Sequence, residues 1–102
     1  MTEQLNISKY KTKLNITEPL HVINYKGKEY RIPFDLDLQV DKGKVIQVDN
    51  RFGFGSEKLP WFAVAVYDLI MGAEQFEDYN TMQAGLSWFR QYFPKQYMTL
   101  LD

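Results

Sequence analysis

The most regular pattern in the chain is an alternation of apolar and polar residues over positions 29–41. Its apolar positions are Tyr30, Ile32, Phe34, Leu36, Leu38 and Val40. A period of two places one set of side chains on the core side of a strand and the other set in water. The pattern therefore predicts a half-buried strand, in which Pro33 marks a sheet edge or a bulge because it donates no hydrogen bond.

The pairs Lys26-Gly27 and Lys42-Gly43 flank this strand. Each pair is typical of a hairpin turn in which the glycine takes a positive φ. At the second turn, a three-residue loop pairs Leu38 with Ile46, which keeps apolar side chains on one face of the sheet. The turns therefore predict a meander with strands near 20–25, 28–40 and 44–50.

Helical patterns follow the strands. Residues 61–71 are apolar on nearly every side, with Ser56 as a candidate cap, Pro60 in the first turn and Gly72 at the end. A buried strand is the alternative for this segment, because its valines and tyrosine favour strands.

A second helix is predicted near Asn80, which together with Gln83 resembles a capping box. One apolar stripe at helical spacing follows, formed by Met82, Leu86, Phe89 and Phe93. Pro94 ends this helix, and residues 97–101 have room for a last turn. Residues 5–16 fit either a strand at the sheet edge or an extended arm.

These elements predict one α+β domain over residues 1–102, in which two helices cover one face of a three- or four-stranded antiparallel meander. Residues 1–19 form the edge strand or arm, 20–50 the meander and 58–102 the helical part. The even-numbered face of the long strand is expected to meet apolar residues of both helices, namely Trp61, Val66, Ile70, Met82, Leu86, Phe89 and Phe93.

Composition narrows the class of protein. Of the 102 residues, 45% are hydrophobic and 16% aromatic, which is enough for one compact core. A net charge of −1 gives no general attraction to nucleic acid or to an anionic membrane. The absence of cysteine excludes disulfides and cysteine-ligated zinc. No signal peptide or membrane span is visible, so we expect a cytoplasmic protein without membrane attachment.

Candidate catalytic and metal-binding residues are few. His21 is the only histidine, and the sequence shows no orienting partner or nucleophile for it. Four aspartates fall on the outer face of the expected meander: Asp35, Asp37, Asp41 and Asp49. Solvated carboxylates are the favoured interpretation, over a Mg²⁺ or Ca²⁺ site. We therefore expect no enzyme activity, no metal and no cofactor.

Surplus aromatic residues favour a protein-binding surface. Trp88 and Tyr92 lie one helical turn apart beside the apolar stripe, so a two-layer fold is expected to leave them exposed. If the helix is rolled inward, Trp88 belongs to the core, and the contact surface is expected at Phe52 and Phe54. The leading hypothesis is a non-enzymatic assembly factor, adaptor or inhibitor, which binds an unidentified protein or a second copy of itself.

Single-stranded nucleic acid is the alternative partner. Aromatic rings beside a cation can stack on bases, and alternating lysines can contact phosphates. Residues of both kinds are present: Lys9, Lys11, Lys13, Arg51, Phe52 and Phe54. The lysines are equally typical of an edge strand protected from aggregation, which makes nucleic acid the less favoured partner.

One segment resembles a known family, through the run Val22-Ile23-Asn24-Tyr25-Lys26-Gly27-Lys28-Glu29-Tyr30-Arg31-Ile32-Pro33-Phe34. This run is similar to the opening hairpin of small siphophage tail assembly chaperones, in which a Gly-Lys-x-Tyr hairpin leads into helices. The resemblance implies an accessory protein encoded by a phage or a mobile element. The chain differs from that pattern by the strand expected at Val45–Val48, and the resemblance assigns no functional residues.

Overall fold

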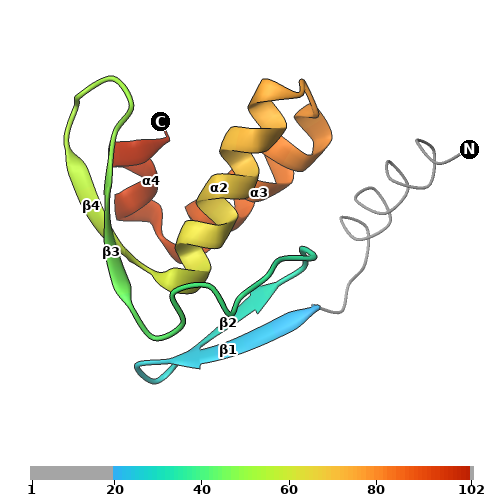
Figure 1. Ribbon diagram of the computed structural model, residues 1–102, viewed down its shortest axis with the longest axis vertical. Coiled ribbons are helices and arrows are strands. Elements are labelled where there is room, and N and C mark those ends of the chain that lie inside the picture. Colours follow the sequence, from blue (N-terminus) through green and yellow to red (C-terminus); the bar gives the residue numbers. More distant parts are fainter. Residues whose placement is uncertain (1–19, 102) are drawn as a thin grey trace, which may run out of the picture. The chain divides into compact units, whose positions relative to one another are not determined.

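A computed structural model describes residues 20–101 of the chain (Figure 1). These residues have an α+β fold, with two antiparallel two-stranded sheets and three helices within the described range. The chain divides into two compact units, Met1–Asp35 and Leu36–Asp102. The first unit contains one sheet, and the second contains the other sheet together with all three helices.

The first unit is the hairpin predicted at the first lysine-glycine pair. Strand β1 (His21–Tyr25) pairs antiparallel with β2 (Lys28–Ile32), and Tyr25 lies opposite Lys28. Lys26 and Gly27 both have positive φ, 51° and 81°, as a two-residue turn of this handedness requires. The expected turn is therefore confirmed.

The long strand expected over residues 28–40 is wrong beyond Ile32. Pro33 has no N–H to continue a ladder. Further along, the Asp37 carboxylate accepts a hydrogen bond from the Gln39 N–H at 3.0 Å, which is a local turn contact. Asp41 has a φ of 55°, a conformation that no regular strand uses. Local side-chain contacts therefore replace the ladder that the alternation predicted.

The expected three-stranded meander is only partly matched, because its first two strands pair as predicted but the third strand has a different partner. Strand β3 (Val45–Asp49) pairs with β4 (Ser56–Pro60), so Ile46 lies opposite Leu59 and not opposite Leu38. Gly43 has the predicted positive φ of 87°, but it belongs to a turn that leads into β3 without forming a hairpin. Two separate hairpins thus replace one meander.

Helix α2 (Trp61–Gln75) confirms the helical interpretation of this apolar segment. It continues past Gly72, where an end was expected. Ser56 does not cap it, since Ser56 begins β4, and Pro60 occupies the N-cap position without a side-chain hydrogen bond. The chain therefore turns directly from β4 into α2.

Helix α3 (Tyr79–Tyr92) begins two residues earlier than expected, because its N-cap is not Asn80. Its N-cap is Asp78, whose side chain accepts a hydrogen bond from the Thr81 N–H at 3.3 Å and another from the Thr81 hydroxyl at 2.7 Å. Helix α4 (Pro94–Leu100) has proline at its start, which is where the ring fits a helix best. The last turn foreseen near residue 97 is thus part of a longer helix.

Gly85 determines the rotation of α3 about its own axis, and therefore which of its residues face α2. A Cβ atom at this position would lie 2.5 Å from the Ile70 Cγ1 atom, so only glycine allows this approach. The buried residues of α3 are accordingly Thr81, Gly85, Trp88 and Phe89. The expected stripe of Met82, Leu86, Phe89 and Phe93 is displaced around the helix, since Met82 and Leu86 are only half-buried.

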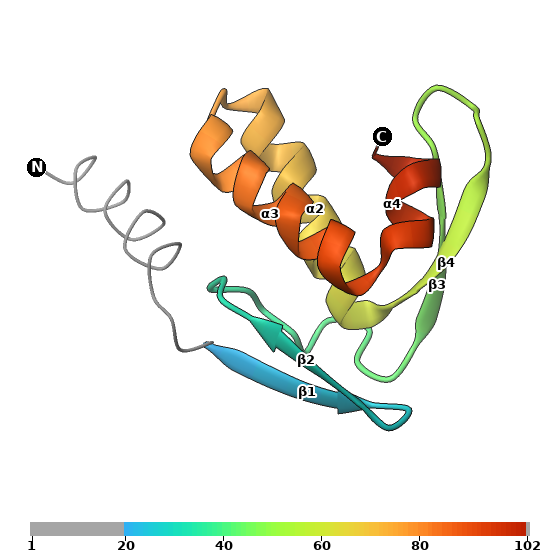
Figure 2. The same ribbon diagram turned by 180° about the vertical axis from the view of Figure 1, so that it is seen from behind.

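The core of the second unit lies between α2, α3, α4 and the inner face of the β3–β4 sheet (Figure 2). Its fully buried side chains include Leu59, Phe62, Val66 and Phe89, each with 0% exposure. Phe34 of the first unit is also buried, at 2% exposure. The burial predicted for Phe34 and Phe89 is therefore confirmed.

A matched pair of glycine substitutions tests the helix approach. Gly72→Ala should raise the thermal midpoint, because an added Cβ meets nothing within 4 Å and alanine favours a helix by about 1 kcal/mol. Gly85→Ala should lower it, because overpacking at Ile70 costs about 1–3 kcal/mol and outweighs the same helical gain. Thermal unfolding followed by circular dichroism measures both. An equal rise in the two variants would show that the helices do not meet at Gly85.

Candidate functional site

Trp88 and Tyr92 do not form the exposed surface that the sequence favoured. Trp88 is 4% exposed, and its ring lies 5.4 Å from that of Phe89 and 5.7 Å from that of Phe93. Tyr92 is half-buried, with its ring 5.1 Å from Trp88. The expected exposure of Trp88 is wrong, because the close approach at Gly85 rolls α3 inward and turns Trp88 into the core.

Two of the aromatic residues that the second unit exposes lie in the loop between β3 and β4, while Phe76 and Tyr79 are exposed where the chain passes from α2 to α3. Phe52 is 67% exposed and Phe54 is 79% exposed. Their ring centroids are 6.2 Å apart, so the two rings form one apolar tip. This loop was the fallback location for a protein contact, and it now becomes the first candidate.

The backbone of this loop is fixed by hydrogen bonds across it. The Asn50 N–H donates to the Gly55 carbonyl at 2.7 Å, and the Gly53 N–H donates to the Asn50 carbonyl at 2.9 Å. Gly53 and Gly55 have φ values of 80° and 130°, which side chains other than glycine rarely adopt. The glycines therefore allow the tight path that brings Phe52 and Phe54 to the same tip.

The Asn50 side chain attaches the loop to α4. Its Nδ2 donates to the Thr99 carbonyl at 2.7 Å, and its Oδ1 accepts from the Phe52 N–H at 2.6 Å. The Thr99 hydroxyl donates to the Glu57 carboxylate at 2.7 Å, which adds a second link between α4 and the hairpin. Asn50 is 7% exposed, so these bonds are shielded from water.

Arg51 links the same loop to α2. Its guanidinium donates to both carboxylate oxygens of Glu74, with 2.8 Å between Nη2 and Oε2. It also lies over the Phe52 ring, 4.9 Å from the centroid. Hydrogen bonding to Arg51 lowers the pKa of Glu74 below its usual value, and the same bond raises the pKa of Arg51.

This pairing changes the interpretation of Arg51. A guanidinium that already holds a carboxylate at both oxygens is neutralised locally, which weakens its attraction for phosphate. The other basic residues of the nucleic-acid hypothesis, Lys9, Lys11 and Lys13, lie outside the described residues. The structure thus brings together Arg51, Phe52 and Phe54, and Glu74 as well, which the sequence did not single out.

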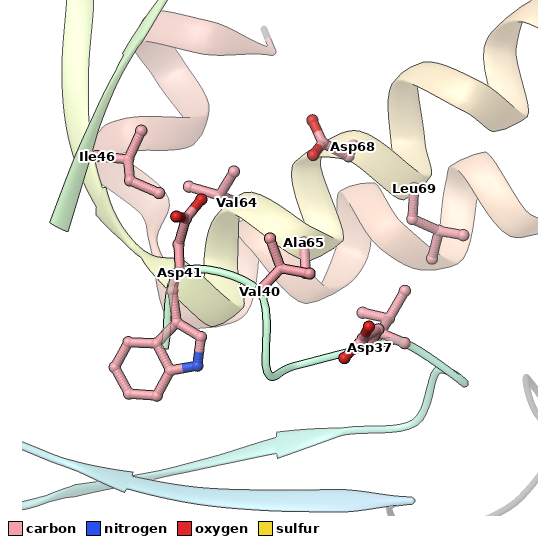
Figure 3. A pocket seen from close by; sticks show the side chains of 10 residues that line it. Asp37, Val40, Asp41, Ile46, Val64, Ala65, Asp68 and Leu69 are labelled. Carbon is pink, nitrogen blue, oxygen red and sulfur yellow. The ribbon is translucent and has the colours of Figure 1, made fainter. Parts of the chain in front are cut away.

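A second feature of this unit is a groove of about 350 Å³ between α2, β3 and the segment before β3 (Figure 3). One face of α2 provides its base, through Trp61, Val64, Ala65, Asp68 and Leu69. Leu36, Asp37, Val40, Asp41 and Ile46 complete the lining. The Trp61 indole N–H donates to the Leu38 carbonyl at 3.0 Å, which fixes the segment before β3 against the start of α2.

Three carboxylates line this mostly apolar groove. Asp41 lies 3.7 Å from the Lys44 ammonium group, while the Asp68 carboxylate has no hydrogen-bond or ion-pair partner among residues 20–101. Burial raises the pKa of Asp68. Sequence reasoning did not single out this groove, although the nearly all-apolar circumference of α2 indicated that the helix has a second apolar face.

The structure also locates the other candidates for chemistry. His21 lies half-buried in β1. Asp35 and Asp49 do not face each other as the meander predicted, because β3 pairs with β4. No group of three potential metal ligands comes together in the described part of the chain. None of the helices described there is both long and apolar enough to cross a bilayer.

Comparison with known proteins identifies no relative of this chain. No protein-family model, no curated protein and no solved structure has a significant match to this chain. The resemblance to siphophage tail assembly chaperones therefore stays a prediction.

Asn50→Ala tests whether the buried amide holds the loop. The change leaves the Phe52 N–H and the Thr99 carbonyl without their partner, and each unsatisfied group costs about 1–3 kcal/mol. We expect the urea midpoint to fall without a change in slope. Gln47→Ala, at an exposed position of β3, serves as the control and should leave the midpoint unchanged. A midpoint unchanged by Asn50→Ala would contradict the proposed attachment to α4.

The Arg51–Glu74 pair makes stability depend on pH. Because the folded pKa of Glu74 is lowered, its stabilisation is complete above the ordinary value of 4.5 and is lost as pH falls through the lower folded pKa. The free energy of unfolding of Glu74→Gln should therefore fall below that of the wild type near neutral pH and converge with it in acid. In an Arg51→Gln background, the same Glu74→Gln change should have little effect at any pH. A constant difference across the pH range would contradict this account.

Proposed function

We propose that this protein is a non-enzymatic protein-binding module, an assembly factor, adaptor or inhibitor, which contacts its partner through Phe52 and Phe54. The observation that supports this most directly is the exposure of two phenylalanine rings on a loop whose backbone is fixed from both sides. Aromatic side chains are enriched at protein interfaces, where a few of them supply much of the affinity.

The rigidity of the loop strengthens the case. Ordering a flexible loop on binding consumes part of the interaction energy, and a loop already ordered by Asn50 and Arg51 avoids that loss. The tip is also mainly apolar, because Glu74 neutralises Arg51, the cation that lies over the Phe52 ring. Such a surface fits an apolar pocket on a folded partner.

The partner is either another protein or a second copy of this chain. Single-stranded nucleic acid remains the alternative hypothesis, and the pairing of Arg51 with Glu74 does not favour it. Salt-dependent retention on immobilised single-stranded DNA would support that alternative instead.

A double substitution at the loop tests the proposal. Phe52→Ser with Phe54→Ser should reduce partner affinity by roughly 30-fold or more, as expected when about 2 kcal/mol of contact is removed. Phe76→Ser is the matched control, because Phe76 is 84% exposed but belongs to the end of α2. Both variants should keep their thermal midpoints, since all three rings are mainly in water.

Partners are captured with the full chain from a lysate of its source organism, and affinities are then measured with the purified partner. Sedimentation at several concentrations measures self-association of each variant in parallel. If the double variant binds and self-associates as the wild type does, the loop is not the contact. If the wild type captures no protein and sediments as a monomer, the protein-binding function is wrong.

A further inference from the structure

The hydrogen-bond pattern of β3 shows which of its backbone groups are free. The Trp61 N–H donates to the Lys44 carbonyl at 3.0 Å, and the Asn50 N–H donates to the Gly55 carbonyl at 2.7 Å. In an antiparallel ladder, bonded and non-bonded positions alternate, so the even-numbered residues of β3 face β4. The N–H and C=O groups of Val45 and Gln47 therefore point away from β4, and no other strand pairs with them in the described part of the chain.

The two edges of this sheet are not equivalent. By the same alternation, Lys58 and Pro60 are the outward-facing positions of β4. Lysine and proline are the residues by which edge strands commonly block pairing with another chain. Strand β3 has neither residue, and its Val45 side chain is 50% exposed. The sheet thus has one protected edge and one open edge.

The open strand also contributes to the groove. Figure 3 shows Ile46 projecting from β3 toward Val64 of α2, with Val40 nearby. Val64, Ala65 and Leu69 are half-buried, so an apolar helix face remains partly accessible beside the strand. The volume of about 350 Å³ lies within the range of about 300–1,000 Å³ that is typical of ligand pockets.

Charge selects the kind of occupant. Asp37, Asp41 and Asp68 line the groove, and Lys44 is the only cation that pairs with any of them among residues 20–101. The Asp68 carboxylate, which has no partner among residues 20–101, would gain one from a lysine or an arginine. A second copy of this chain would place a second acidic groove against the first. Repulsion between the like charges of the two grooves would oppose such a dimer.

We propose that the open edge of β3 and the acid-lined groove bind an extended segment of a partner protein, in which apolar residues alternate with lysine or arginine. The segment adds as a third strand beside Val45 and Gln47, with main-chain hydrogen bonds giving affinity. Because neighbouring side chains of a strand point to opposite faces, its basic side chains turn toward the carboxylates of the groove and cover the apolar lining with their methylene stems, while its apolar side chains lie on the other face beside Val45. This inference rests on the proposed protein-binding function but uses a different surface from Phe52 and Phe54.

Defined peptides test this site directly. The probe is a fluorescein-labelled decapeptide of five Val-Lys repeats, titrated with the full-length protein and followed by anisotropy. A decapeptide of five Val-Glu repeats is the charge control. We expect the lysine peptide to bind at least about tenfold more tightly than the glutamate peptide, with an affinity that falls as salt is added.

Variants separate strand addition from simple charge attraction. Gln47→Pro removes an outward N–H without breaking a bond to β4, and Asp68→Lys reverses the charge in the groove. Each should weaken binding of the lysine peptide by about tenfold or more. The Phe52→Ser, Phe54→Ser double variant should bind that peptide as the wild type does, so failure of this site and failure of the loop proposal are distinguishable.

Amide hydrogen exchange of the wild type provides a second measurement that does not depend on Gln47→Pro folding. Bound lysine peptide should slow exchange at the Val45 and Gln47 amides by about tenfold or more. No slowing at these amides would overturn the proposal, even if Asp68→Lys lost binding, because charge alone would then explain the affinity. Equal binding of both peptides would overturn it too, as would a β3-mediated dimer that excludes the peptide.

Discussion

The second unit depends on the close approach of two helices at Gly85. A side chain there would collide with Ile70, which is itself buried in the core at 2% exposure. Since position 85 must face α2, residues at the neighbouring turns of α3 face it as well, and Thr81 and Trp88 enter the core. One missing Cβ atom thus decides which aromatic residues of α3 pack inside and which remain available at the surface.

The same approach determines what α2 leaves uncovered. Helix α3 covers the face of α2 that carries Phe62, Val66 and Ile70. The opposite face, with Val64, Ala65 and Leu69, is also apolar and is only half-buried beside β3. A helix that is apolar all round is normally surrounded by protein. Here only part of the second face is surrounded, which produces the groove.

Much of the secondary structure followed from local pattern. The Lys26-Gly27 turn, the helix from Trp61 and the burial of Phe34 and Phe89 were all predicted, because each depends on spacing or on turn chemistry within a few residues. The α+β class followed from the same signals. Strand β4 was missed because its five residues show little alternation, and only Leu59 and Pro60 are buried.

The errors that mattered for the candidate site were errors of tertiary context. Apolar spacing alone favoured Met82 and Leu86 as the buried stripe, whereas the space available at Gly85 decided the roll of α3. The role of Asn50 could not be foreseen, because its partner Thr99 is 49 residues away. The pairing of Arg51 with Glu74 likewise joins a loop to a distant helix. Contacts of this range leave no periodic trace in a sequence.

The β3–β4 hairpin connects the two proposed surfaces. A two-stranded hairpin is marginally stable alone, so this one depends on its supports, which are α4 through Asn50 and α2 through Arg51. Those supports hold the Phe52–Phe54 tip and also fix the strand whose edge is open. Pro60 makes the two edges of the sheet different. It leads into α2, and it lacks the N–H group that another strand would need for pairing at the β4 edge. A further strand can therefore join this sheet on the β3 side, where the groove and its carboxylates already lie.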